Sequence, residues 1–146
     1  MSAEVLSAIL QEAARGGELE TGGILLGREM APAAETRIDM AGGPGPLAAR
    51  GPRSFSRDLG HAQQLAAEAW RESGALWVGD WHTHPDSEPV PSPVDLRSYA
   101  AHLADPELDF QRFVSIVVGC AHGVPQSIAA WLISDGRVEQ AQLLVT

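Results

Sequence analysis

Hydrophobic and polar positions along this chain follow two periods, which predicts that helices and strands follow one another. Apolar residues recur at helical spacing over residues 4–15, over residues 58–73 and again from Leu96 to Leu103. Short apolar runs bounded by glycine or turn residues predict strands instead. These runs cover residues 23–27, 36–40, 76–83, 113–119, 127–134 and 138–145.

Glycine and proline mark where these elements end. Gly16-Gly17 and Gly74 are expected to end the first two helices, and Asp135-Gly136 predicts a hairpin turn between the last two strands. Residues 42–52 are expected to form a long surface loop, and the four prolines within residues 85–93 predict an extended, stiff one. The order of elements predicts an α/β fold in which helices flank a mixed β-sheet.

Composition narrows the class of protein. A chain of 146 residues with 45% hydrophobic content suits a single globular domain, expected to cover residues 1–146. A net charge of −9 argues against nucleic acid as a partner, although it is compatible with a basic protein partner or with solubility alone. No apolar run is long enough for a membrane helix, and the acidic residue Glu4 is atypical of a signal peptide, so we expect a cytoplasmic protein. The single cysteine, Cys120, excludes an internal disulfide and a cysteine-based zinc knuckle.

Two histidines stand at the end of the predicted strand 76–83. On an extended strand, His82 and His84 point to the same side, about 7 Å apart, and Pro85 favours an extended conformation at His84. Taken alone, this pair is as typical of ordinary core or surface histidines as it is of metal ligands. Ser92 and Asp95 follow in a Ser-Pro-Val-Asp sequence that is also typical of a helix start, with Ser92 as N-cap.

Together these side chains suit a catalytic metal site. Two imidazoles and one carboxylate are common zinc ligands, and three protein ligands leave a fourth position open for water. A helix that starts at residue 92 fixes Ser92 and Asp95 on one edge, where the stiff loop can bring them over the strand. The chain lacks the His-Glu-x-x-His motif of zincins and the Pro-Cys-x-x-Cys motif of nucleobase deaminases. The combination therefore predicts a zinc-dependent hydrolase.

The spacing His-x-His, seven residues, Ser, two residues, Asp resembles the signature of the JAMM metallopeptidases, the active MPN-plus type of MPN domain. Residues 20–27, Glu-Thr-Gly-Gly-Ile-Leu-Leu-Gly, are similar to the segment that carries the upstream glutamate of that family. The chain resembles its compact prokaryotic branch most closely. The resemblance implies a three-layer MPN-like fold, with layers similar to those of cytidine deaminases.

The resemblance also implies a role for each residue. His82, His84 and Asp95 would bind Zn²⁺, Glu20 would act as general base toward the metal-activated water, and Ser92 would donate a hydrogen bond to the developing oxyanion. Without the resemblance, Glu20 is better interpreted as a solvated acid at a loop end.

The implied substrate is a peptide or isopeptide bond at the C-terminus of a ubiquitin-like protein. A sulfur-carrier protein as substrate remains an alternative, as does a non-catalytic MPN scaffold for protein–protein assembly. The sequence does not indicate an oligomeric state.

The remaining candidates are weaker. Asp80 shares the strand face of His82 and could hydrogen-bond a ligand imidazole, although a solvated or capping aspartate is the simpler interpretation. We expect the Cys120 thiol to be buried rather than nucleophilic. The other histidines, His61, His102 and His122, have no partner at ligand spacing and are expected to be non-functional.

Overall fold

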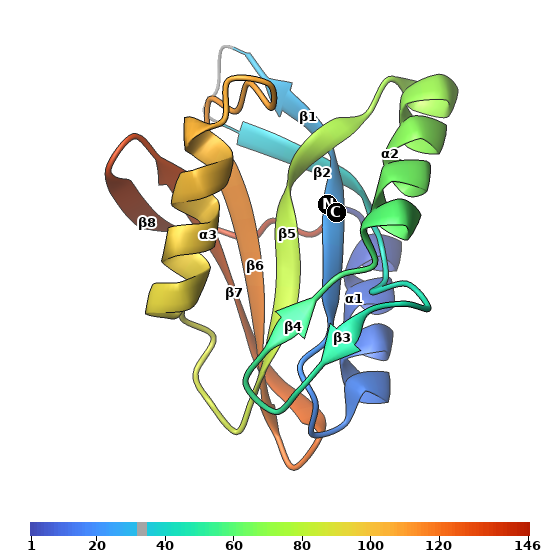
Figure 1. Cartoon of the computed structure of the whole chain (residues 1–146), viewed down its shortest axis with the longest axis vertical. Helices are drawn as coiled ribbons and strands as arrows, with labels where there is room; N and C mark the ends of the chain where they lie inside the picture. The colour runs from blue at the N-terminus through green and yellow to red at the C-terminus, as the bar shows by residue number, and fades with distance from the viewer. Residues whose placement is uncertain (32–34) are drawn as a thin grey trace.

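A computed structural model describes residues 1–31 and 35–146 and shows a six-stranded mixed sheet between two layers of helix (Figure 1). The strand order is β2-β1-β5-β6-β7-β8, in which only β5 and β6 are parallel. The sheet strands are β1 (Gly22–Met30), β2 (Glu35–Ala41), β5 (Leu76–Pro85), β6 (Phe113–Ala121), β7 (Val124–Ser134) and β8 (Arg137–Ala141). This arrangement confirms the predicted α/β fold.

The three helices begin and end close to where their sequence signals predicted. They are α1 (Ala3–Gly16), α2 (Leu59–Ser73) and α3 (Pro93–Ala104). Ser2 and Asp58 cap the first two helices through their side chains, and Gly74 closes α2 in the left-handed conformation that glycine favours. Among the described residues, no helix has both the length and the apolar character needed to cross a membrane.

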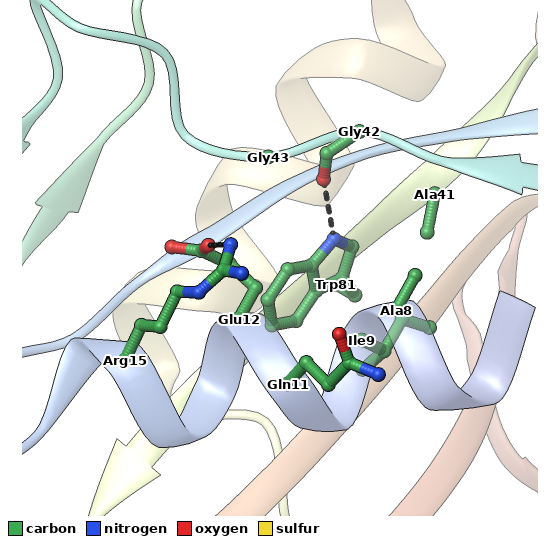
Figure 2. A pocket seen from close by; sticks show the side chains of 9 residues that line it. All are labelled: Ala8, Ile9, Gln11, Glu12, Arg15, Ala41, Gly42, Gly43 and Trp81. Atoms are coloured by element: carbon green, nitrogen blue, oxygen red, sulfur yellow. Dashed lines mark hydrogen bonds and ion pairs between the residues drawn. The ribbon is translucent and has the colours of Figure 1, made fainter.

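The helices cover the two faces of the sheet. Val5, Ile9 and Ala13 of α1 pack against a cluster that includes Trp81 on one face. The other face holds two further clusters, one with α2 and one with Tyr99 of α3. Trp81 therefore lies under a helix, as its alternation with the two histidines predicted. Its indole donates to the Gly42 carbonyl oxygen at 2.8 Å, beside a cavity of about 240 Å³ between α1 and the end of β2 (Figure 2).

Two parts of the chain differ from the sequence prediction. The predicted loop 42–52 contains β3 (Ala49–Arg50), which pairs with β4 (Phe55–Ser56) in a small separate hairpin. Strands of two residues have no periodicity, so no pattern marks them. The last strand ends at Ala141 rather than at residue 145, because the following residues run beside the N-terminus. There the Met1 ammonium donates to the Leu144 carbonyl and the Thr146 amide donates to the Met1 carbonyl, each at 3.0 Å.

The two adjacent glycines at the start of β1 allow backbones to approach closely on both sides of that strand. A Cβ atom at Gly22 would lie 2.3 Å from the Trp81 carbonyl oxygen in β5. A Cβ atom at Gly23 would lie 1.9 Å from the Gly42 carbonyl oxygen after β2. Since both contacts are with backbone, no side-chain rotation relieves them, and β1 can sit in its place only without side chains at these positions.

Substitution of Gly22 tests this close approach. We expect Gly22→Ala to lower the free energy of unfolding by at least about 2 kcal/mol, because β1 and β5 must separate to admit the methyl group. Gly43→Ala is the control, since no atom lies within 4 Å of a Cβ there, and its effect should stay within about 0.5 kcal/mol. Denaturant unfolding measures both, and equal effects would contradict the packing argument.

Candidate metal centre

Three candidate metal-ligand atoms, contributed by β5 and α3, meet at the end of β5. The Nε2 atoms of His82 and His84 lie 3.0 Å apart, and each lies 3.1 Å from Oδ2 of Asp95 at the start of α3. Both histidines are buried and Asp95 is partly exposed, so the cluster lies at a surface. The structure thus brings together the three residues that the sequence singled out as ligands.

The segment between these elements is held at its start and in its middle. After β5, the Asp86 amide donates to the Cys120 carbonyl at 2.8 Å, and the Asp86 carboxylate accepts from the His122 amide at 2.9 Å. Further along, the Trp131 indole donates to the Pro89 carbonyl at 3.0 Å. This proline-rich segment is therefore fixed to β6 and β7, and it delivers Ser92 and Asp95 to the end of β5.

The start of α3 has the predicted capping geometry. The Ser92 hydroxyl accepts from the Asp95 amide at 3.1 Å, and Oδ2 of Asp95 accepts from the Ser92 amide at 2.8 Å. The same carboxylate oxygen faces the two imidazoles. Because the Ser92 oxygen accepts the capping bond, its O–H proton remains free to be donated elsewhere.

The donor set and its spacing fit a divalent metal ion. The Nδ1–H group of His84 donates to the Glu88 carbonyl at 3.0 Å, which orients the ring so that Nε2 faces the cluster. A tetrahedral zinc ion with bonds of about 2.0–2.1 Å keeps its ligand atoms about 3.3 Å apart. The observed separations of 3.0 and 3.1 Å are therefore only slightly shorter than an ion requires.

Strand pairing brings Glu20 to the same place. Gly22 of β1 lies opposite His82 of β5, and the Thr83 amide donates to the Thr21 carbonyl at 2.9 Å. Continued by one more residue, this register puts Glu20 opposite His84. Glu20 is half-buried, and the charges of His82, His84 and Asp95 lie close enough to affect the pKa of its carboxyl group. Glu20 is thus a neighbour of the cluster rather than a solvated acid at a distant loop end.

The environment shifts the pKa values of these groups in different directions. Burial raises the pKa of Glu20, and the nearby histidines only partly offset it. For Asp95, burial acts upward, but hydrogen bonds from both imidazoles and from the Ser92 amide hold its pKa well below the usual range. Burial lowers the pKa of His84, yet its bonds to Asp95 and to the Glu88 carbonyl outweigh burial and leave it raised. The surroundings of Asp95 therefore favour its ionised form.

The remaining sequence candidates lie outside the cluster. Asp80 accepts from the Trp77 indole at 3.2 Å and forms an ion pair with Arg57, so its partners are not the imidazoles considered for it. Arg57 has no signal in the sequence, because it lies far from Asp80 along the chain and has no motif around it. The Cys120 side chain is buried, as predicted, and burial raises the pKa of its thiol. The His102 ring stacks on Phe113.

Fold and site together define a class: an α/β domain with a candidate two-histidine, one-aspartate metal centre beside a glutamate. Residues 2–134 match the family described as prokaryotic homologs of the JAB domain. The chain belongs to this family, which confirms the resemblance to JAMM and MPN proteins.

Individual relatives carry names that support a hydrolase. The chain is 34% identical over 117 residues to a "probable metalloprotease y4qB" of Sinorhizobium fredii, a match that covers 78% of this chain and 71% of the relative. It is 29% identical over 119 residues to a "CD-NTase/cGAS isopeptidase" of Enterobacter hormaechei subsp. hoffmannii, where the match covers 82% of this chain. The chain spans only 66% of the length of that isopeptidase.

Solved structures support the fold. A solution structure of protein DSY2949 from Desulfitobacterium hafniense matches 99% of this chain and 90% of its own with a TM-score of 0.73 at 20% identity. A protein from Salinibacter ruber matches 100% of this chain and 92% of its own with a TM-score of 0.65 at 22% identity.

Thr83, between the two histidines, is expected to hold the backbone next to Glu20. Its hydroxyl accepts from the Thr21 amide at 3.0 Å, and both threonines are buried. Thr83→Val removes that acceptor and should lower the free energy of unfolding by about 1–3 kcal/mol. It should also speed hydrogen exchange at the Thr21 amide. Thr83→Ser keeps the acceptor and loses only a methyl group, so exchange at Thr21 should stay slow. A protected Thr21 amide in Thr83→Val would show that the bond is dispensable.

Proposed function

We propose that this chain is a zinc-dependent metallopeptidase, with residues 1–146 forming one JAMM-type catalytic domain. Its substrate would be a peptide or isopeptide bond at the C-terminus of a ubiquitin-like or sulfur-carrier protein. The observation that carries the proposal is the meeting of His82 Nε2, His84 Nε2 and Asp95 Oδ2 beside Glu20. A non-catalytic scaffold has no need of all four side chains in one place.

The names of the relatives bear on the bond that is cleaved. One is an isopeptidase whose name refers to CD-NTase and cGAS proteins, and another is a probable metalloprotease. Both names describe hydrolysis of an amide bond, and the first refers to a bond that joins a protein to another group. A protein conjugate is therefore the substrate class that the comparisons favour for this chain.

In this mechanism His82, His84 and Asp95 would hold a zinc ion. When bound, zinc lowers the pKa of its water to about 7 and polarises a carbonyl group. Glu20 takes a proton from the attacking water and later gives it to the leaving amine. Burial raises the pKa of Glu20, which makes its carboxylate a better proton acceptor than that of an exposed glutamate.

Ser92 has a free hydroxyl proton at the edge of the cluster. As the attacked carbonyl carbon becomes tetrahedral, its oxygen gains negative charge, and a fixed hydroxyl donor stabilises that charge. The cap at the start of α3 sets the direction of this side chain, because its oxygen already accepts the Asp95 amide. Ser92 therefore needs no rearrangement of the backbone in order to donate.

Metal content and hydrolysis should separate the ligands from the base. His84→Ala and Asp95→Ala should each lose stoichiometric zinc, because two donors hold the ion poorly. Glu20→Gln should keep zinc while kcat falls at least about a hundredfold. His122→Asn changes an exposed histidine outside the cluster, which is bonded to Asp86 through its backbone amide, and should keep both. Elemental analysis after dialysis and a cleavage assay on ubiquitin-like and sulfur-carrier fusions measure these effects. An unchanged rate in Glu20→Gln would rule out the proposed base.

Ser92 has two proposed roles, capping α3 and donating a hydrogen bond to the oxyanion, and two variants can separate them. Ser92→Ala should cost about 1 kcal/mol of stability through the lost cap, whereas Ser92→Gly, a tolerated N-cap, should cost only a few tenths. Neither variant has a hydroxyl, so kcat should fall about 10²- to 10³-fold in both. Thermal unfolding and steady-state kinetics measure the two roles. A normal kcat in Ser92→Gly would leave Ser92 with the capping role alone.

A further inference from the structure

The β3–β4 hairpin with its flanking residues, 47–57, carries exposed basic and apolar side chains. Arg50 ends β3, Arg53 lies in the turn, and both are exposed. Leu47, which precedes β3, is 83% exposed, and few apolar side chains of this chain reach as far into solvent. We call these three residues, Leu47, Arg50 and Arg53, the cationic hairpin surface.

Two contacts hold this surface beside the metal centre. The Gly51 carbonyl accepts the amide of Glu20 at 2.8 Å, so the hairpin turn is bonded to the backbone of the proposed base. At the other end of the segment, Arg57 forms an ion pair with Asp80, which shares the β5 face of His82 and His84. Figure 1 shows the hairpin on the side of the sheet that carries α2 and α3. The hairpin therefore lies beside the proposed base and beside the strand that carries the two histidines.

The charge of this segment is opposite to that of the chain. Residues 40–57 contain three arginines and no acidic residue, in a chain whose net charge is −9. Arg57 is paired with Asp80, whereas no described residue forms an ion pair with Arg50 or Arg53. The adjacent acid, Asp58, accepts from the Leu47 and His61 amides, each at 3.1 Å, and is thus held by backbone donors. Two guanidinium groups and one aliphatic side chain remain for a partner.

We propose that the cationic hairpin surface binds an acidic segment of the protein substrate next to the bond that is cleaved. Carboxylates of this segment would meet Arg50 and Arg53, and an apolar residue would cover Leu47. Planar guanidinium groups bind carboxylates with two parallel hydrogen bonds, which suits this pairing. The proposal rests on the proposed function only in taking the bound chain to be the substrate.

Binding can be measured without hydrolysis. The probes are three fluorescent peptides of equal length, each with one leucine, in which the other variable positions are all Glu, all Gln or all Lys. The Glu20→Gln variant should bind the Glu peptide about tenfold more tightly than the Gln peptide at low salt. In about 0.5 M NaCl the two peptides should bind equally. Equal binding of the Glu and Gln peptides would overturn the proposal, and so would a preference for a single-stranded oligonucleotide over the Glu peptide.

A charge swap makes the test specific to the hairpin. Arg50→Glu/Arg53→Glu should reverse the order, so that the Lys peptide binds more tightly than the Glu peptide. Arg71→Glu/Arg137→Glu makes the same change of net charge at two exposed arginines, one in the last turn of α2 and one in β8, and should leave the order unchanged. If both double variants shift binding alike, net charge rather than this surface is the cause, and the proposal fails.

Cleavage kinetics connect the surface to the proposed reaction. With ubiquitin-like fusions that carry Glu or Gln beside the scissile bond, Arg50→Glu/Arg53→Glu should lower kcat/KM about tenfold for the Glu fusion alone and leave kcat at saturation unchanged. Equal loss on both fusions would contradict the inference while the proposed function stands. Absence of cleavage by the zinc-loaded wild type would contradict the proposed function, while the peptide binding decides the inference separately.

Discussion

The antiparallel pairing of β1 with β5 is the constraint on which the site depends. It places Gly22 opposite His82 and joins Thr21 to Thr83 through their backbones and through the Thr83 hydroxyl. A strand places alternate side chains on opposite faces, so a shift of one residue would turn Glu20 away from the histidines. Gly22 lets this pairing form, because a side chain there would meet the Trp81 backbone, and Gly23 allows the same close approach to Gly42 on the other side of β1.

At the start of α3, a single carboxylate serves both the helix cap and the candidate metal site. One carboxylate oxygen of Asp95 accepts the Ser92 amide and faces both imidazoles. The partial positive charge of a helix N-terminus favours an ionised carboxylate there, which agrees with the lowered pKa of Asp95. Structure and candidate chemistry therefore do not compete for this residue. The hydrogen bond from the Ser92 amide, which begins the helix, also fixes Oδ2 of Asp95 as a candidate metal ligand and favours its charged form.

Sequence patterns predicted the parts of the molecule that local interactions determine. Helix ends at Gly74 and Ser92 follow from caps, and the common direction of His82 and His84 follows from strand alternation. Features that depend on distant pairing were not predictable from the residues themselves. The Arg57–Asp80 ion pair and the β3–β4 hairpin have no local signal, and Glu20 gained its place only through the family resemblance. Sequence spacing carries no information on which strands become neighbours, since several pairings bury the same apolar residues.

The way each element is held indicates where substrate selectivity can arise. Glu20, His82 and His84 are fixed by a strand pairing within the sheet, and Asp95 is fixed by a helix cap, so changes at these points would damage the cluster itself. Within the part of the chain that the structure describes, β3 and β4 form a sheet of their own, which meets the rest of the site through the Gly51–Glu20 bond and the Arg57–Asp80 pair. Its side chains at positions 50 and 53 point into solvent and take no part in the core. A hairpin of this kind can change its charge without moving the cluster, which makes it a suitable element to distinguish one protein substrate from another.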